Sequence, residues 1–233
     1  MTTIDGRAAL EQIHGGLVVS CQAREDNPLH GPVFMAAMAA AAMQGGAVGI
    51  RANGVADITA IRARIGPGVP IMGILKTKKP DGSLFITASS DDALQVIGAG
   101  ASLVALDGTR RSRPGGEPLA EIVAAIHAAG GAALADVGTI EHAAYAIDAG
   151  VDAVGTTLSG YTPDSVKLEG PDFGLLERLA KTCSVSVFAE GRIWTPEEAW
   201  RALGLGASFV VVGTAITNPT AITERFVAQM AGR

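Results

Sequence analysis

Apolar runs of strand length recur along the whole chain at fairly even intervals. Most are apolar along their length, which is typical of strands in a parallel sheet that is covered on both faces. Eight such runs are present, at residues 17–20, 47–51, 69–76, 102–107, 132–136, 153–156, 185–190 and 208–213. Segments with helical periodicity lie between them, among them residues 32–44, 117–129, 140–149 and 196–203.

This alternation of strand and helix predicts a (β/α)8 barrel. No linker or low-complexity segment interrupts it, and 233 residues suit one large α/β domain, so we expect a single barrel domain over residues 1–233. Glycines follow several of the helices and supply the turn that leads back to the next strand. A doubly wound parallel sheet would use most of the same elements, and periodicity alone leaves it open.

Composition narrows the class of protein. A hydrophobic fraction of 48% and 30 glycines fit a large packed α/β core, and a net charge of −5 argues against a general nucleic-acid binder. Two cysteines are too few for a disulfide framework. The first fifteen residues do not have the pattern of a signal peptide, and no apolar run has transmembrane length. We therefore expect a soluble, cytoplasmic protein that binds neither nucleic acid nor membranes.

Polar residues stand where the apolar runs stop, and the opposite ends of the runs carry no comparable set. In a barrel of parallel strands all these residues converge on one mouth, which is where catalytic groups are found. In chain order they are Ser20-Cys21-Gln22, Arg51, Lys76, Asp107-Gly108-Thr109, Asp136, Gly155-Thr156-Thr157, Glu190-Gly191-Arg192 and Gly213-Thr214.

Lys76 and Glu190 are the strongest candidates for acid–base chemistry. Lys76 ends a buried run and is followed at once by the polar segment 77–82. Such a lysine either extends into solvent or is held, partly desolvated, in a pocket. Desolvation lowers a lysine pKa, and a nearby carboxylate opposes that shift. We take Lys76 as a candidate catalytic base with Glu190 as its partner.

Other reactive residues have simpler interpretations. We expect Asp107 to cap the loop that follows it through backbone N–H groups. Cys21 is interpreted as a small buried residue, since no histidine is near it in sequence. His127 and His142 lie in helical patterns and are expected to face outward, so neither a metal centre nor a Ser-His-Asp site is predicted.

The last two strand ends indicate a phosphate site. Glycine directly after a strand lets backbone N–H groups approach an anion, and in phosphate-binding barrels the loops after strands seven and eight form this cradle. Gly191 and Gly213 stand at those two positions. Arg192 could add a charge-assisted contact, and Thr214 begins the following segment.

With these residues assembled, the chain resembles the bacterial N-acetylmannosamine-6-phosphate 2-epimerases from about residue 15 to residue 230. The longest matching run, Gly155-Thr156-Thr157-Leu158-Ser159-Gly160-Tyr161-Thr162, and Arg111-Ser112-Arg113-Pro114 are far more specific than a barrel pattern. The other matching segments are residues 16–22, 50–51, 71–76, 86–88, 106–109, 189–192 and 212–217.

The resemblance implies a (β/α)8 enzyme that interconverts N-acetylmannosamine 6-phosphate and N-acetylglucosamine 6-phosphate in sialic acid and amino-sugar catabolism, without cofactor or metal, and as a homodimer. It implies Lys76 as the group that removes and returns the C2 proton, with Glu190 as partner. Gln22, Arg51 and Asp136 would hold the sugar, and Gly191, Arg192, Gly213 and Thr214 the phosphate.

The chemistry of such a reaction agrees with these residue types. The C2 proton becomes acidic when the sugar ring opens to an aldehyde, and the resulting enolate needs a positive neighbour, for which Arg51 is a hypothesis. One lysine could serve both faces of C2, or Glu190 could act as a second acid. Two other functions remain open on the same scaffold: a Schiff-base aldolase with Lys76 as nucleophile, and a sensor of sugar phosphates that does no chemistry.

Overall fold

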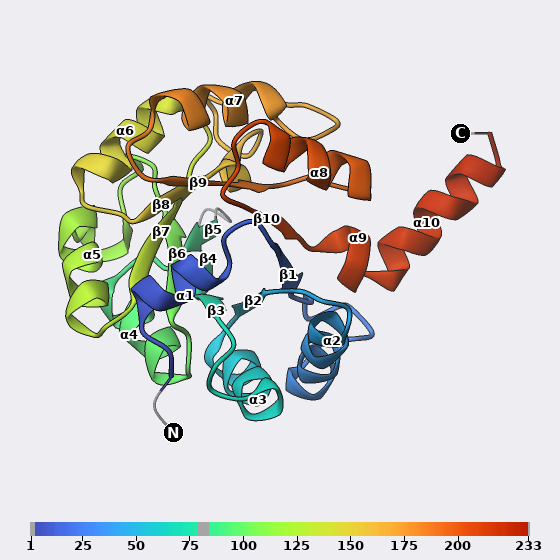
Figure 1. Cartoon of the computed structure of the whole chain (residues 1–233), viewed down its shortest axis with the longest axis horizontal. Helices are drawn as coiled ribbons and strands as arrows, with labels where there is room; N and C mark the ends of the chain where they lie inside the picture. Colours follow the sequence, from blue (N-terminus) through green and yellow to red (C-terminus); the bar gives the residue numbers. More distant parts are fainter. Residues whose placement is uncertain (1–2, 79–83, 233) are drawn as a thin grey trace.

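A closed barrel of eight parallel strands forms the centre of the molecule (Figure 1). The computed structural model describes residues 3–78 and 84–232. The barrel order is β1-β10-β9-β8-β7-β6-β3-β2, so the predicted (β/α)8 fold is confirmed and the doubly wound sheet is wrong. The strands are β1 (Leu17–Cys21), β2 (Gly49–Asn53), β3 (Ile71–Ile74), β6 (Leu103–Asp107), β7 (Ala132–Asp136), β8 (Ala153–Gly155), β9 (Ser186–Glu190) and β10 (Phe209–Val212).

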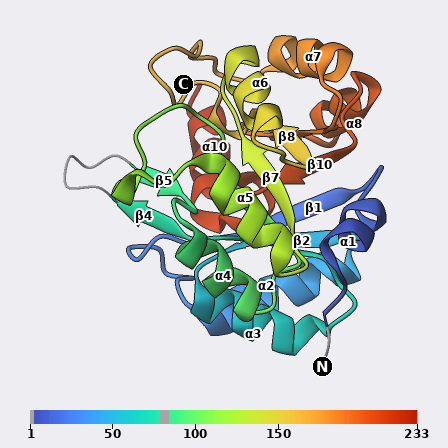
Figure 2. The ribbon, with the colours of Figure 1, turned by 90° about the vertical axis from the view of Figure 1, so that its left-hand side faces the viewer.

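Helices cover the outside of the barrel and return the chain to the start of each next strand (Figures 1 and 2). This outer layer consists of α2 (Pro32–Gln44), α3 (Val55–Ile65), α4 (Ser90–Gly98), α5 (Leu119–Ala128), α6 (Ile140–Asp148), α7 (Phe173–Thr182) and α8 (Pro196–Gly204). After β10 the chain forms the short α9 (Thr214–Thr217) and then α10 (Pro219–Met230), which projects away from the barrel (Figure 1). Among the described residues, no helix has both the length and the apolar character needed to cross a membrane.

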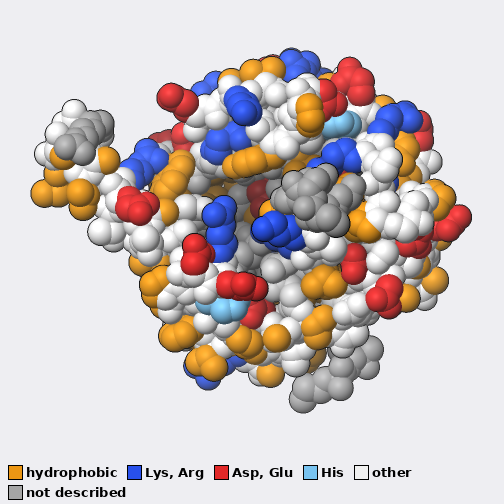
Figure 3. Space-filling view, turned by 180° about the vertical axis from the view of Figure 1, so that it is seen from behind, with side chains coloured by type: hydrophobic (Ala, Val, Ile, Leu, Met, Phe, Trp, Pro, Cys, Tyr) orange, Lys and Arg blue, Asp and Glu red, His pale blue; other side chains and the backbone are white. Residues whose placement is uncertain are grey.

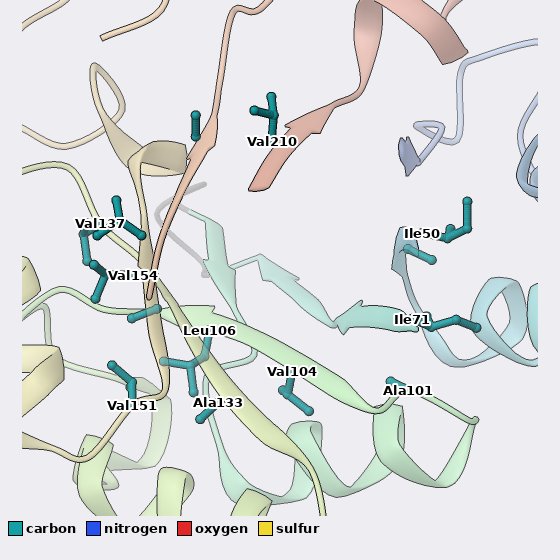
Figure 4. Packing of buried hydrophobic residues seen from close by; sticks show 14 of the residues in the cluster. Ile50, Ile71, Ala101, Val104, Leu106, Ala133, Val137, Val151, Val154 and Val210 are labelled. Atoms are coloured by element: carbon teal, nitrogen blue, oxygen red, sulfur yellow. The ribbon is translucent and has the colours of Figure 1, made fainter. Parts of the chain in front are cut away.

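Side chains alternate between two cores because successive residues of a strand point to opposite faces. Outward residues such as Ile50, Val104 and Val154 pack against the helices (Figure 4). Inward residues fill the barrel, where Phe188 and Phe209 stack with their ring centroids 5.0 Å apart.

A glycine makes room for that stack. A Cβ added at the inward-facing Gly155 of β8 would lie 2.1 Å from the ring of Phe188. The barrel interior is therefore a packed core and not a channel.

The helix α1 (Gly6–Gln12) closes the end of the barrel where the strands begin. Ala9 and Ile13 are fully buried among the inward-facing barrel residues. Gly6 lies directly on the start of β7, since an added Cβ there would be 2.1 Å from the backbone nitrogen of Ala132. The opposite end, where the strands finish, remains open for a ligand.

The predicted strand 69–76 is wrong in its second half. The barrel strand β3 ends at Ile74, and Lys76 begins β4 (Lys76–Lys78), which pairs with β5 (Leu84–Ile86) in an antiparallel ribbon outside the barrel. Figure 2 shows this ribbon extending from the barrel. The end of the predicted polar segment, residues 79–82, lies outside the described residues. Lys76 is therefore placed by a two-stranded ribbon, opposite Ile86.

Candidate functional site

Polar side chains from four barrel strands and the β4–β5 ribbon meet at the open end of the barrel. Gln22 follows β1, Arg51 lies in β2, and Asp136 and Glu190 are the last residues of β7 and β9. Lys76 reaches the same end from the ribbon and contacts Gln22. Figure 3, which views the molecule from behind, shows a hollow in the middle of this face with charged side chains around it.

Arg51 is buried beneath this mouth and binds two carboxylates. Its Nη1 and Nη2 atoms donate to the two oxygens of Asp136 at 3.0 and 2.6 Å. Nη1 also donates to Oε2 of Glu190 at 2.5 Å. The planar guanidinium suits this bidentate geometry, and the side chains of Arg51 and Asp136 are 1% and 0% exposed. Arg51 is thus the centre of a buried charged cluster made of Arg51, Asp136 and Glu190.

Glu190 is hard to ionise in this cluster because it is buried and lies beside a second carboxylate. Burial raises the pKa of Glu190 to about 7; Arg51 opposes this change and Asp136 adds to it. Burial also opposes the charge on Arg51, but Asp136 and Glu190 outweigh it and hold the pKa of Arg51 above its ordinary value. Near neutral pH, Glu190 can therefore gain and lose a proton while Arg51 stays charged.

Lys76 is held at its side chain and at its backbone. Its Nζ atom donates to Oε1 of Gln22 at 2.7 Å, and Nε2 of Gln22 donates to Oγ of Ser20 at 2.7 Å. The bond to Ser20 orients the amide so that its oxygen faces the lysine. The backbone N–H of Lys76 donates to Oδ1 of Asn53 at 2.9 Å. These bonds direct the ammonium group toward the barrel mouth.

The surroundings of Lys76 lower its pKa. The side chain as a whole is exposed, but its ammonium end is partly withdrawn from water, and this burial lowers the pKa of Lys76. The cation of Arg51 lowers the pKa further and Arg24 adds a smaller effect, whereas Glu190 and Asp136 act in the opposite direction. Lys76 and Glu190 thus have pKa values displaced toward each other, as expected of an acid–base pair.

The ribbon that carries Lys76 is fixed to the barrel by Thr87. The hydroxyl of Thr87 donates to the carbonyl of Ala105 in β6 at 2.7 Å and accepts from the N–H of Leu75 at 3.2 Å. Thr87 is fully buried and has φ = 46°, an unfavourable conformation for a β-branched residue. The hydrogen bonds offset this strain and set the position of Leu75, directly before Lys76.

Two neighbouring threonines hold Glu190 from the side of β8. β8 ends at Gly155 and the chain turns into η2 (Thr156–Leu158), so the β8–β9 ladder stops before Glu190. In place of the missing ladder bonds, the hydroxyl of Thr156 donates to the carbonyl of Glu190 at 2.9 Å and accepts from the N–H of Glu190 at 3.1 Å. The hydroxyl of Thr157 lies 2.6 Å from Oδ1 of Asp136 and 3.3 Å from Oε2 of Glu190.

The predicted phosphate residues lie in the loops after β9 and β10. Gly191 and Arg192 have φ values of 113° and 57°, so two consecutive residues adopt the left-handed region. The side chain of Arg192 is engaged elsewhere: Nε donates to the carbonyl of Gly170 at 2.8 Å and Nη1 to that of Ser159 at 2.7 Å. The guanidinium of Arg192 therefore fixes the loop after β8.

Gly213 and Thr214 lie beside the end of β1. A Cβ added at Gly213 would lie 3.2 Å from the Cβ of Ser20, so the absence of a side chain permits this close approach. Thr214 is the first residue of α9, and Thr217 in the same helix donates to the carbonyl of Ser20 at 2.8 Å. These contacts place the loop after β10 against the end of β1, two residues before Gln22.

Comparison with known proteins identifies the family of the chain. The model of the family described as "Putative N-acetylmannosamine-6-phosphate epimerase" matches residues 35–232. The chain belongs to the N-acetylmannosamine-6-phosphate epimerase family. Proteins named "Putative N-acetylmannosamine-6-phosphate 2-epimerase" from Caldanaerobacter subterraneus and Clostridioides difficile are 48% and 46% identical to it, each over 94% of this chain and over 92% and 97% of their own lengths.

A solved structure supports the same assignment. The N-acetylmannosamine-6-phosphate 2-epimerase from Clostridium perfringens superposes with a TM-score of 0.91 and is 46% identical in sequence. The superposition covers 94% of this chain and 95% of that one. The epimerase family and the (β/α)8 fold are therefore established together, and the resemblance noted from the sequence motifs is confirmed.

Sequence reasoning did not assign several residues that hold the epimerase-family site together. Asn53, Thr87 and Thr157 each bond a member of the site or its supporting ribbon. The strand pattern could have indicated one of them. Asn53 lies two residues after Arg51 in β2 and shares its inward face, whereas Thr157 lies in η2, beyond the end of β8. Thr87 carried no comparable signal, because its role depends on the conformation of the ribbon.

Asp107, Cys21 and His127 lie as the sequence predicts, and His142 does not. Asp107 accepts from the N–H of Thr109 at 2.9 Å, as predicted. Cys21 is buried in the outer core, where burial raises the pKa of its thiol to about 12, so the packing role is confirmed. His127 is exposed as predicted, but the prediction for His142 is wrong. Its side chain is buried and lies 3.0 Å from the carboxylate of Asp164.

His142 and Asp164 line a separate cleft of about 320 Å³ between the loops after β6 and β8. The residues that line it do not include Lys76 or Glu190. Within the described ranges 3–78 and 84–232, no group of three or more His, Cys, Asp and Glu side chains is arranged to hold a metal ion.

We expect Glu190 to make the folded protein lose stability as the pH rises from about 4.5 to about 7. The ordinary pKa of 4.5 becomes about 7 in the fold, so over this interval the folded chain binds more protons than the unfolded chain. The free energy of unfolding then falls with rising pH. Glu190→Gln removes this contribution. Urea unfolding of both proteins across the interval measures it, and a pH-independent difference between them would contradict the expectation.

Proposed function

We propose that this protein interconverts N-acetylmannosamine 6-phosphate and N-acetylglucosamine 6-phosphate, which differ only in configuration at C2. The observation that carries the proposal is that Lys76 and Glu190 both lie at the barrel mouth and influence each other electrostatically, with pKa values displaced toward each other. Proton removal and return next to a carbonyl needs such a pair near neutral pH. Membership of the epimerase family supplies the substrate.

In the proposed reaction Lys76 acts on the open-chain form of the sugar. The neutral amine of Lys76 takes the C2 proton and becomes an ammonium ion, and the electron pair of the C–H bond moves into the enolate. Return of a proton to the opposite face of C2 inverts the configuration. The partner Glu190 accepts or donates the proton that ring opening and closing require. No change of oxidation state occurs, because one proton leaves C2 and one returns.

The remaining polar groups would bind the substrate. Gln22, already bonded to Lys76, and Asp136 would hold sugar hydroxyl groups, and Arg51 would keep Asp136 and Glu190 in place while stabilising the enolate electrostatically. The phosphate would lie against the loops after β9 and β10, on backbone N–H groups of Gly191, Arg192, Gly213 and Thr214. Since its guanidinium binds two carbonyls, Arg192 would contribute its backbone.

An NMR assay in deuterated water tests the function. N-acetylmannosamine 6-phosphate incubated with the protein should be converted to N-acetylglucosamine 6-phosphate with deuterium incorporated at C2. Cleavage of a carbon–carbon bond would instead support the Schiff-base aldolase, and binding without exchange would support the sensor. The family of the chain favours the epimerase over both.

We also propose that the protein works as a homodimer through α10. This helix has no buried residue, and Phe226, Val227 and Met230 are 67%, 60% and 85% exposed. The helix projects away from the barrel (Figure 1). Apolar side chains gathered on such a helix indicate a surface that another protein covers. A second copy of the chain is the simplest partner because it carries the same helix.

Replacing both Phe226 and Met230 with serine should convert the dimer to a monomer. Light scattering after gel filtration would then report the mass of one chain. The matched control is Leu94→Ser, which removes an exposed apolar side chain of α4 on another side of the barrel and should leave the dimer intact. A monomeric wild-type protein, or a dimer that survives the double substitution, would contradict the proposal.

Two broader proposals concern the chain as a whole. We propose that residues 1–233 form one cooperative domain, because α1 at one end of the sequence and α9 near the other both pack on the barrel. A single urea transition seen by both fluorescence and circular dichroism would support this. The proposed site of action is the cytoplasm, where charged sugar phosphates are retained; cell fractionation tests it.

A further inference from the structure

The hydroxyl of Thr157 lies between the two carboxylates of the buried cluster. It is 2.6 Å from Oδ1 of Asp136 and 3.3 Å from Oε2 of Glu190. A threonine hydroxyl carries a single proton and can rotate, so it donates to one of these oxygens at a time. The shorter distance favours Asp136 as the acceptor in this structure.

The position of Thr157 is fixed by its neighbours in the chain. Thr157 lies in η2, directly after Thr156, whose hydroxyl bonds both the N–H and the carbonyl of Glu190. The turn that ends β8 therefore places two adjacent side chains against Glu190. Thr156 binds its backbone, and Thr157 lies beside its carboxyl group.

The charged groups that face this cluster come from several elements. Arg51 reaches it from β2, Asp136 from β7 and Glu190 from β9. Lys76 acts on Glu190 from the β4–β5 ribbon, and Arg24, in the loop after β1, acts on Lys76. Arg51 satisfies both oxygens of Asp136 but only one oxygen of Glu190. Thr157 is thus an uncharged hydrogen-bond donor beside two carboxyl groups that share the guanidinium of Arg51.

We propose that Thr157 is a positioning residue of the epimerase, whose hydroxyl donates to Asp136 while Glu190 carries a proton and turns to Glu190 when that carboxyl ionises. The inference rests on the proposed roles of Lys76 and Glu190. In the first state the hydroxyl oxygen accepts the proton of the Glu190 carboxyl, and in the second its O–H supports the carboxylate. Asp136 keeps its two bonds from Arg51 throughout, so Glu190 is the carboxyl that exchanges the proton.

Replacing Thr157 with valine tests this directly. Valine has nearly the same shape and lacks the hydroxyl, whereas Thr157→Ser keeps the hydroxyl and is the matched control. A hydrogen bond to an ionised carboxylate is stronger than one to a neutral carboxyl. We therefore expect the valine variant to move the titration of Glu190 to higher pH by about one unit, and the serine variant to leave it in place.

The titration is measured by NMR on protein labelled with ¹³C at glutamate carboxyl carbons, with the resonance of Glu190 assigned from Glu190→Gln. In parallel, the limb of the pH–rate profile that follows Glu190 should move in the same direction, and kcat/KM should fall about tenfold in the valine variant, with recovery in the serine variant. If the valine variant does not fold, Thr157→Ala carries the same test.

An unchanged titration of Glu190 in the valine and alanine variants would overturn the role of Thr157, whatever happens to the rate. An equal displacement in the serine variant would also overturn it, since the hydroxyl would then not be the cause. Failure of the wild-type protein to exchange the C2 proton would be a different result. It would overturn the proposed function, while the NMR titration would still report on the cluster itself.

Discussion

Replacing Lys76 with methionine is expected to lower kcat/KM for the epimerisation by about a thousandfold or more and to stop deuterium exchange at C2. Methionine keeps an unbranched stem of similar length and cannot take a proton. Because the backbone of Lys76 is held by Asn53 and by pairing with Ile86, the fold should not change. The exchange of C2 deuterium from water, followed by NMR, measures the chemical step directly.

The matched control for this substitution is Lys78→Met. Lys78 lies on the same short strand, two residues away, and its side chain is exposed. Its loss should alter the rate by no more than a few fold. Retained exchange in the Lys76 variant would remove Lys76 from the mechanism. Borohydride treatment of wild-type protein with substrate should give no covalent adduct, and a trapped adduct would show that Lys76 acts as a nucleophile.

Replacing Arg51 with methionine should lower the free energy of unfolding by about 3–5 kcal/mol, the largest stability effect that we expect in this protein. The substitution leaves Asp136, which is fully buried, and Glu190 facing each other without a cation. The cost comes mainly from these uncompensated charges and not from the lost contacts. Urea unfolding at neutral pH measures it.

A second substitution separates the buried charge from the loss of packing. Adding Asp136→Asn to the Arg51 variant removes the buried carboxylate that has lost its cation and should recover part of the stability. The comparison for a surface ion pair is Arg7→Met, since Arg7 and Glu11 are 90% and 71% exposed and their pair is worth less than about 1 kcal/mol. Equal effects at Arg51 and Arg7 would contradict the expectation.

The geometry of Arg51 gives it more than one role. The hypothesis from sequence was that Arg51 stabilises the enolate, and that role is still a prediction. The structure adds that Arg51 is 1% exposed, binds both carboxylates, and lowers the pKa of Lys76 by its charge. One buried cation therefore lowers the pKa of both Lys76 and Glu190, and so favours loss of a proton from the base and from its partner.

Much of the candidate site could be predicted because strand direction is encoded locally. Parallel strands all end on the same side of a barrel, so a polar residue after an apolar run must lie at the common mouth. This argument correctly brought Arg51, Asp136 and Glu190 together and placed Gln22 at the same end of the barrel. It failed in detail at Lys76, which lies on a ribbon outside the barrel and not at the end of β3. The run 69–76 is continuously apolar up to the lysine, so the break at Leu75 leaves no mark in the pattern.

Other parts of the structure were beyond the reach of the pattern. The plug helix α1 was not predicted, because its segment is too short and mixed in composition to show a clear period. It becomes a helix because Asp5 caps it and because Ala9 and Ile13 can be buried against the barrel. That burial exists only once the barrel has formed.

The sequence by itself determined the eightfold repeat, the end of the barrel that carries the polar groups and, through its motifs, the epimerase family. Only the tertiary structure decided which of those groups touch. Arg51 meets residues 85 and 139 positions further along the chain, and Thr157 comes to lie between their two carboxylates. The reason is physical. Direction and periodicity are local properties of each strand, whereas a contact of 2.5 to 3 Å depends on how eight strands are staggered when the barrel closes.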